Sequence, residues 1–493
     1  MPAMRGTVRV VAAAAASLVL TLTGTVAGSA APRPDRPAPP EPTALAKQLT
    51  RDVTLAGVHR HLVALQRIAD SNGGNRAAST PGYAASVDYL VRKLRAAGFE
   101  VSTPQFQYEA EIVDRAEFSV GGSGVEIVPM AYSPSTPEGG VSAPLVVVPE
   151  DGSPGCEASD YDGLPIGGAI ALIRRGACTF ADKQAIAGEA GAVAAVISNN
   201  VEGPLRGSLG GPDAGVIPTV GISQADGDTL SQQEGATATL NLQIRREQRT
   251  TRNVIAQTRS GRTDNVVMAG AHLDSVADGP GINDNGSGSA ALLETALQLG
   301  GNPQINNAVR FAWWGAEERG LLGSQAYVSG LSQEQQLDVA LYLNFDMVGS
   351  PNAAYFAYDG DDSDGVGAGP GPAGSAQIEQ AFVDFLQGRR DVPVAGTDFS
   401  GRSDYGPFIA LGIPAGGLFT GAEGIKTPEQ AAKWGGQAGI AYDPCYHQAC
   451  DTLDNVDRTA LERNSDAIAW VTASYAITTE EVNGVAPRPG RGP

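Results

Sequence analysis

The feature that most limits how this chain can fold is a set of short apolar runs, each ending in a histidine or an acid. The first run, Val266–Ala269, leads directly into His272 and Asp274. An apolar run of this length is typical of a buried strand. A polar, glycine-rich loop with Asp284 follows, and Ser289–Leu299 then has a helical composition with Asn, Ser and Gly at its entry.

Two further runs repeat this arrangement. Val309–Ala316 ends in Glu317 and Glu318, and Leu341–Phe345 ends in Asp346. Strand, ligand-bearing loop and helix are the layout of a site at the carboxyl edge of an open α/β sheet. One H-x-D pattern alone is more often a loop histidine than a ligand, but the repetition favours a metal site at one sheet edge.

The motifs resemble peptidase family M28, and within it the secreted streptomycete zinc aminopeptidases. In chain order they are AHLDS, GINDNGSGSAA, RFAWWGAEE, YLNFDMVGS, GRSD, GLFTG and CYHQACD. The resemblance implies an α/β fold, a three-layer αβα sandwich with a mixed, mostly parallel central sheet. We place this peptidase domain at residues 51–109 and 249–480, interrupted by an insert.

The resemblance also implies two zinc ions. Asp284 would bridge them, His272 and Asp346 would complete one site, and Glu318 and His447 would complete the other. Two metals about 3.5–4 Å apart suit peptide hydrolysis, because they activate water and polarise the carbonyl. Nitrogen and carboxylate ligands favour zinc over magnesium or calcium, although manganese or cobalt could substitute.

Three further residues receive roles by resemblance: Glu317 as general base, Tyr446 as donor to the oxyanion, and Asp274 as the partner that orients His272. Alternative interpretations remain open. Glu317 and Glu318 could be a solvated helix start, Asp274 a solvated loop acid and Tyr446 a buried aromatic. Because neighbours on a strand face opposite ways, both glutamates can reach one site only if the chain leaves the strand there.

The substrate pocket is predicted from matches to the same family. Phe419 would line a hydrophobic side-chain pocket, and Arg402 would lie near the substrate carbonyl or the product carboxylate. Two positions depart from the pattern. Tyr405 stands where the family often has His, and Gly396 stands near an acid that binds the free amine in relatives. Asp398 could replace that acid.

A structural calcium ion is also implied by resemblance. Its ligands would be Asp52, the Val53 carbonyl, Glu462 and Asp466. A solvated acidic surface would explain the same residues.

Residues 110–248 differ in character, with short apolar runs separated by Gly and Pro. The stretch Ile166–Phe180 resembles a protease-associated (PA) domain, which implies a small β-rich insert without catalytic residues. The insert contains no histidine, which favours a binding or gating module.

The ends of the chain indicate export. Residues 1–31 have the basic start, apolar run and small-residue end of a signal peptide, and a membrane anchor is the alternative. Residues 32–50 are predicted as a proline-rich propeptide or linker, and residues 481–493 as a flexible tail. A formal charge of -20 argues against a nucleic-acid partner.

Four cysteines in an exported chain predict disulfides, and four allow three pairings. Local spacing favours Cys156–Cys178 and Cys445–Cys450. Metal ligation by cysteine is the alternative, but neither pair has C-x-x-C spacing.

We therefore predict a secreted, monomeric metalloprotease: a dizinc aminopeptidase acting on peptide and protein N-termini, with preference for large apolar residues such as Leu. Two alternatives are kept. One is a metallopeptidase of dipeptidase or carboxypeptidase specificity. The other is an inactive peptidase fold that binds partners through the PA domain, which predicts a missing ligand, and none is missing.

Overall fold

The computed structural model describes residues 44–488 except 212 and 368, so the predicted signal peptide and most of the proline-rich segment lie outside the described residues. Helix α1 (Ala44–Asp52) begins within the segment predicted as linker, and α13 (Glu480–Asn483) extends into the segment predicted as a flexible tail. Leu49 and Val482 explain the difference, because each is an apolar side chain buried in the core of the peptidase domain.

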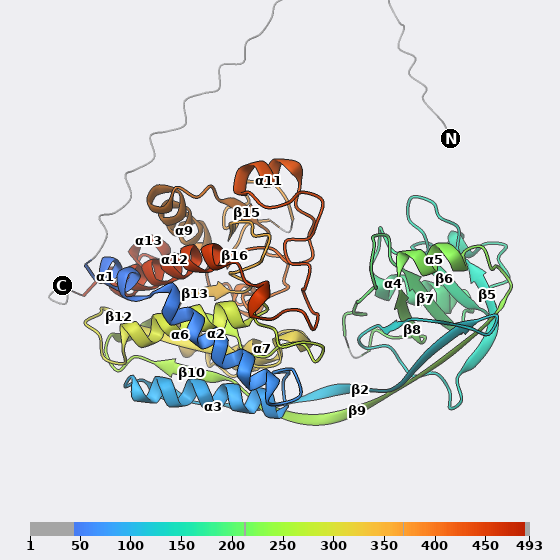
Figure 1. Ribbon diagram of the computed structural model, residues 1–493, viewed down its shortest axis with the longest axis horizontal. Helices are drawn as coiled ribbons and strands as arrows, with labels where there is room; N and C mark the ends of the chain where they lie inside the picture. Colours follow the sequence, from blue (N-terminus) through green and yellow to red (C-terminus); the bar gives the residue numbers. More distant parts are fainter. Residues whose placement is uncertain (1–43, 212, 368, 489–493) are drawn as a thin grey trace, which may run out of the picture. The chain divides into compact units, whose positions relative to one another are not determined.

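The peptidase domain is built on an eight-stranded mixed sheet (Figure 1). Its strands, in spatial order, are β1 (Glu100–Ser102), β10 (Val254–Gln257), β12 (Asn307–Trp314), β11 (Arg262–His272), β13 (Val339–Phe345), β16 (Ala415–Phe419), β14 (Phe356–Tyr358) and β15 (Ala395–Thr397). The four central strands, from β12 to β16, are parallel, and antiparallel pairings occur toward both edges. The prediction of a mostly parallel centre is confirmed.

Helices cover both faces of this sheet. On one face Val267 and Ala269 pack with residues of α2 (Leu55–Asp70), α3 (Pro81–Ala96), α6 (Gly286–Leu299), α9 (Ser375–Arg390) and α12 (Arg458–Ile477). On the other, Val266 and Met268 pack with α7 (Leu322–Ser329) and α10 (Gly406–Ala410). Alternate residues of one strand face opposite layers, so the buried strand is apolar on both sides. The result is the predicted three-layer αβα sandwich.

The insert forms a second eight-stranded sheet. Its strands, in spatial order, are β3 (Ser123–Val125), β2 (Gln105–Val120), β9 (Thr237–Arg252), β5 (Val141–Val147), β6 (Ile170–Arg174), β7 (Ala194–Ser198), β8 (Thr219–Ile222) and β4 (Val128–Pro129). Helices α4 (Phe180–Glu189) and α5 (Gln224–Leu230) pack with it. The predicted boundaries at residues 110 and 248 fall within β2 and β9, which pair continuously from Gln105 to Val120 apart from one bulge.

The two predicted disulfides are present. Cys156 and Cys178 pair ahead of α4, and Cys445 and Cys450 close a loop of the peptidase domain. Helices α8 (Gln333–Leu337) and α11 (Pro428–Trp434) are short connecting elements. Within the described range, no helix combines the length and apolar character that a bilayer crossing needs.

Candidate active site

Parallel strand ends gather the predicted ligands at one edge of the peptidase sheet. His272 is the last residue of β11, Asp346 follows β13, and Glu317 and Glu318 follow β12. These three strands are neighbours, with β11 in the middle. Because parallel strands end at the same edge, side chains separated by many residues in sequence meet there.

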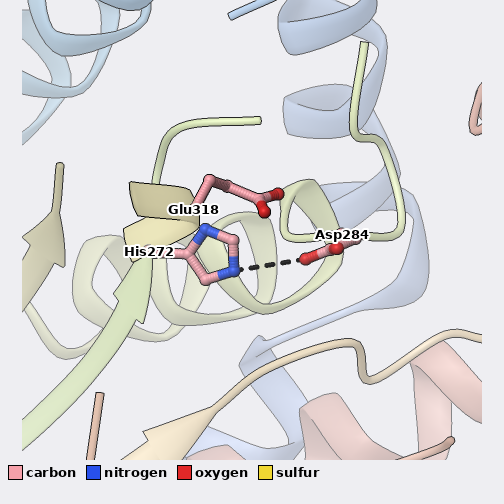
Figure 2. A group of neighbouring side chains, drawn as sticks. All are labelled: His272, Asp284 and Glu318. Carbon is pink, nitrogen blue, oxygen red and sulfur yellow. Dashed lines mark ion pairs between the residues drawn. The ribbon is translucent and has the colours of Figure 1, made fainter. Parts of the chain in front are cut away.

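Asp284 lies between two imidazoles. Its Oδ1 is 3.2 Å from Nε2 of His272, and its Oδ2 is 3.2 Å from Nε2 of His447. Figure 2 shows the His272 ring directed at Asp284, with Glu318 beside them. A carboxylate that presents one oxygen to each histidine has the arrangement of a bridging ligand between two ions.

The remaining carboxylates divide between the same two histidines. Asp346 Oδ1 is 3.3 Å from His272 Nε2, and Glu318 Oε2 is 3.0 Å from His447 Nε2. This division matches the two ligand sets predicted from sequence. The structure therefore brings together all five predicted ligands.

The donor set fits zinc. Oε1 of Glu318 and Oδ1 of Asp346 are buried and accept no hydrogen bond from any described residue. A buried carboxylate oxygen that accepts no hydrogen bond is costly unless a nearby cation compensates its charge. Imidazole nitrogen together with carboxylate oxygen is a donor set that zinc binds well.

A change of backbone course lets both glutamates face the site. Strand β12 ends at Trp314, and Ala316 adopts a left-handed conformation with φ of 59°. A single 3₁₀ turn, Glu317–Arg319, follows. The chain leaves the strand where the sequence analysis required it, so the two side chains are not held on opposite faces.

Asp274 acts differently from the prediction. Nδ1 of His272 is 3.1 Å from the backbone carbonyl oxygen of Asp274, whereas the nearest carboxylate oxygen is 3.8 Å away. That carboxylate instead accepts a hydrogen bond from the backbone N–H of Glu317, at 3.2 Å. The carbonyl thus orients the imidazole, and the side chain ties the turn that carries Glu317 to the loop after the histidine strand.

A pocket opens beside these residues. Four of the predicted ligands, all except Glu318, line it together with Glu317. Its other walls include Met347, Tyr358, Phe419 and Ala422, and the predicted Asp398 and Arg402. Arg402 donates a hydrogen bond to the hydroxyl of Tyr446 at 3.3 Å. The Tyr446 ring stacks on His447 with centroids 3.8 Å apart.

Known proteins resemble the chain over nearly its whole length. The profile of peptidase family M28 matches residues 253–472, and that of the PA domain matches residues 141–230. The probable lipoprotein aminopeptidase LpqL of Mycobacterium tuberculosis is 48% identical over 482 residues, which cover 96% of this chain and 95% of the relative. The chain belongs to peptidase family M28.

Other relatives of this M28 peptidase agree with that assignment. Leucine aminopeptidase 2 of Arthroderma otae is 46% identical, across 85% of this chain and 82% of the relative. Among solved structures, the aminopeptidase of Aneurinibacillus sp. strain AM-1 has a TM-score of 0.69 and 29% identity, covering 87% of this chain and 95% of that one. BSAP, a zinc aminopeptidase from Bacillus subtilis, has a TM-score of 0.68 and 25% identity, covering 87% and 98%.

Several supporting residues of the M28 site were not assigned from sequence. The Asp451 carboxylate accepts hydrogen bonds from the backbone N–H groups of Asn283 and Asp284, at 2.8 and 2.9 Å. Ser403 donates to Asp346 Oδ2 at 2.6 Å, and Ser324 donates to the buried Asp404 at 2.5 Å. Asp451 lies in the motif CYHQACD, and Ser403 and Asp404 lie in GRSD. A motif does not show which atom each of these side chains will contact.

Burial shifts the pKa of the supporting acids. Burial, reinforced by the charge of Asp443, raises the pKa of Asp451 to about 7. Burial likewise raises the pKa of Asp404 to about 7. Both groups lie behind the ligands and fix their surroundings.

Tyr405, which replaces the family's usual His, is buried, and its hydroxyl accepts a hydrogen bond from the backbone N–H of Gly401 at 2.9 Å. It therefore holds the loop that carries Arg402 and Ser403.

The calcium site, whose predicted ligands include the Val53 carbonyl oxygen, stays a prediction. Asp52, Glu462 and Asp466 do not form a cluster of metal-binding size in the described part of the chain. The guanidinium of Arg390 donates directly to the Asp466 carboxylate, where the prediction had calcium. Calcium is therefore not carried into the proposed function.

Proposed function

We propose that this M28 peptidase is a dizinc aminopeptidase that hydrolyses the N-terminal peptide bond of peptides and proteins. The observation that carries the proposal is the position of Asp284 between His272 and His447. Asp346 and Glu318 would complete the two ligand sets. Zinc bound there would lower the pKa of water and polarise the scissile carbonyl.

Glu317 is the base in this proposal. Its carboxylate is buried at the site, with Oε2 3.8 Å from His272 Nε2. A buried carboxylate beside the ligands is placed to take a proton from water and later pass it to the leaving amine.

Tyr446 supplies a hydrogen bond to the developing oxyanion. A tyrosine hydroxyl ordinarily has a pKa of about 10, so it carries its proton at neutral pH. The same oxygen accepts a hydrogen bond from Arg402. Its own proton is therefore left for the substrate.

Preference for large apolar N-terminal residues rests on the pocket walls. Met347, Tyr358 and Phe419 offer apolar surface beside the proposed zinc ligands. The name leucine aminopeptidase 2 borne by one relative points the same way. Asp398, on the same pocket, is proposed to bind the free amine, as the sequence suggested.

Secretion is part of the proposal and rests on the sequence of residues 1–31. The relative named a lipoprotein aminopeptidase supports export without deciding whether this chain is released. Monomer is the proposed state.

The test is a panel of Leu-, Lys-, Glu- and Gly-p-nitroanilides, assayed beside N-blocked peptides. We expect the Leu substrate to be cleaved fastest, activity to disappear with a chelator, and two equivalents of zinc to restore it. Cleavage of blocked peptides alone would point to another peptidase specificity. Absence of turnover with two zinc ions bound would favour the inactive binding protein.

A further inference from the structure

We propose that Arg76 is a positioning residue for the zinc site, acting on the backbone that joins His272 to Asp284. The proposal rests on the dizinc function proposed above. Arg76 lies in the connection between α2 and α3, almost two hundred residues before the loop that it contacts.

The guanidinium of Arg76 is fully buried and donates from all three of its nitrogens to backbone carbonyls of this loop. Nε donates to Pro280 O at 2.9 Å, Nη2 to Gly281 O at 2.5 Å, and Nη1 to Leu273 O. Leu273 directly follows one proposed ligand, and Gly281 precedes the other by three residues. The three contacts therefore clasp both ends of the segment between the ligands.

The backbone of Arg76 adds a fourth contact. Its N–H donates to Ser275 Oγ at 2.9 Å, and that hydroxyl lies 3.0 Å from the carbonyl oxygen of Gly279. The loop is thus wrapped around one residue that belongs to neither the sheet nor α6. Because Gly281 has φ of 60°, the chain also turns sharply at one of the clasped carbonyls.

Arginine is the side chain that this arrangement needs. A planar guanidinium offers donors in several fixed directions, whereas a lysine offers one nitrogen. Burial lowers the pKa of Arg76 to about 10, while nearby carboxylates, Asp274 and Asp451 first, oppose that shift. The group therefore remains a cation at neutral pH.

The positive charge of Arg76 and its hydrogen bonds to the loop predict opposite effects on zinc affinity. A buried cation near the ligands repels zinc, so removing its charge alone would tighten binding. Removing the clasp takes away the donors to the Leu273 and Pro280 carbonyls, at a cost of about 1–3 kcal/mol each, and frees the loop to rearrange. The Gly281 carbonyl would keep only the backbone N–H of Gly286, at 3.0 Å. We infer that geometry dominates, because all three nitrogens are used on backbone.

The test compares Arg76→Met and Arg76→Lys with the wild-type full chain. Zinc affinity is measured by competition with a chromophoric chelator, and the visible spectrum of the cobalt-loaded protein reports ligand geometry. We expect Arg76→Met to bind zinc about 10–100-fold more weakly, the range for loss of a group that orients metal ligands, with an altered cobalt spectrum. Arg76→Lys keeps the positive charge but has one nitrogen in place of the three of the guanidinium. Its zinc affinity and cobalt spectrum should resemble those of Arg76→Met more than those of the wild type.

Lys183→Met is the matched control. Lys183 is a fully buried cation of the PA domain whose Nζ donates to the carbonyl of Pro154. Its loss should lower the melting temperature without changing zinc affinity or the cobalt spectrum. If Arg76→Met does not fold, Arg76→Lys and Ser275→Ala, which removes the fourth contact, provide the comparison.

Unchanged or tighter zinc binding by Arg76→Met would overturn the proposal. Wild-type zinc binding by Arg76→Lys would overturn it too, because it would show that the three-nitrogen contact is not needed. The proposed aminopeptidase function is tested separately. Wild-type protein that binds zinc but does not hydrolyse the anilides would contradict it. A ratio of zinc affinities that shows no weakening in the variants would contradict the role of Arg76, whatever the turnover.

Discussion

We propose different roles for the two adjacent glutamates that follow β12. Glu318 Oε2 is 3.0 Å from His447, whereas Glu317 lies nearest His272, at 3.8 Å. Glu317→Gln removes the proposed base and leaves the ligands in place. We expect kcat/KM to fall by about 10²–10⁴-fold with two zinc ions retained, as measured by anilide hydrolysis and elemental analysis.

Glu318→Gln is the control for that variant, because it alters a proposed ligand instead of the base. It should lower zinc content as well as turnover. A Glu317→Gln protein that keeps wild-type turnover would show that another group takes the proton.

Asp284→Asn tests the bridging role directly. An amide offers one neutral oxygen where the carboxylate presents a charged oxygen to each of His272 and His447. We expect loss of at least one zinc ion per chain in elemental analysis. Asp398→Asn lies on the same pocket and should keep both ions. Two zinc ions retained in Asp284→Asn would contradict the bridging assignment.

Among the elements, helices α2, α3 and α6 are joined by a buried polar group. His61 lies 2.9 Å from Glu294 through Nε2 and 2.7 Å from the Tyr89 hydroxyl through Nδ1. Burial raises the pKa of Glu294, but hydrogen bonds from His61 and Gln298 outweigh it and hold the pKa below its usual 4.5. The ionised carboxylate therefore stabilises the packing of these helices.

A depressed pKa stabilises the fold above pH 4.5, and this contribution is lost as the pH falls further. Glu294→Gln should lower the free energy of unfolding by about 1.5–3 kcal/mol at pH 7, with a shrinking difference below pH 4.5. Chemical denaturation at several pH values measures it. Asp88→Asn, which alters a surface pair with Arg252, should change stability by less than about 1 kcal/mol. A difference for Glu294→Gln that does not vary with pH would refute the linkage.

For the whole molecule, the question is what the PA domain does for a peptidase domain that holds all the proposed catalytic residues. We hypothesise that it limits the length of substrates. Because Ile112 pairs directly with Arg245, residues 113–244 can be replaced by Asn-Gly, which closes a two-residue hairpin.

The shortened enzyme should cleave Leu-p-nitroanilide at a rate close to that of the full chain. Its ratio of long-peptide to short-peptide turnover should rise. An unchanged ratio in a protein with a normal melting transition would remove the hypothesis.

The sequence by itself determined the buried strands, the histidine and acids that follow them, and both disulfides. Each depends on a local pattern: apolar runs that form buried strands, polar residues at their ends, and cysteines close in the chain. Val309–Ala316 is an example, because the run and its terminal acids are adjacent. When such strands are parallel neighbours in the sheet, the residues at their ends lie close together. The sandwich layers and the set of five proposed ligands, His447 among them, came from the resemblance to family M28.

Only the tertiary structure decided which residues hold the backbone next to the proposed ligands. Arg76 and the loop it clasps are almost two hundred residues apart, and Asp451 holds backbone N–H groups more than 160 residues away. The tertiary structure also pairs the Asp274 carboxylate with the backbone N–H of Glu317, and the Arg390 guanidinium with the Asp466 carboxylate. The physical reason is that a hydrogen bond to a distant backbone atom leaves no periodicity in the sequence, whereas a buried strand does.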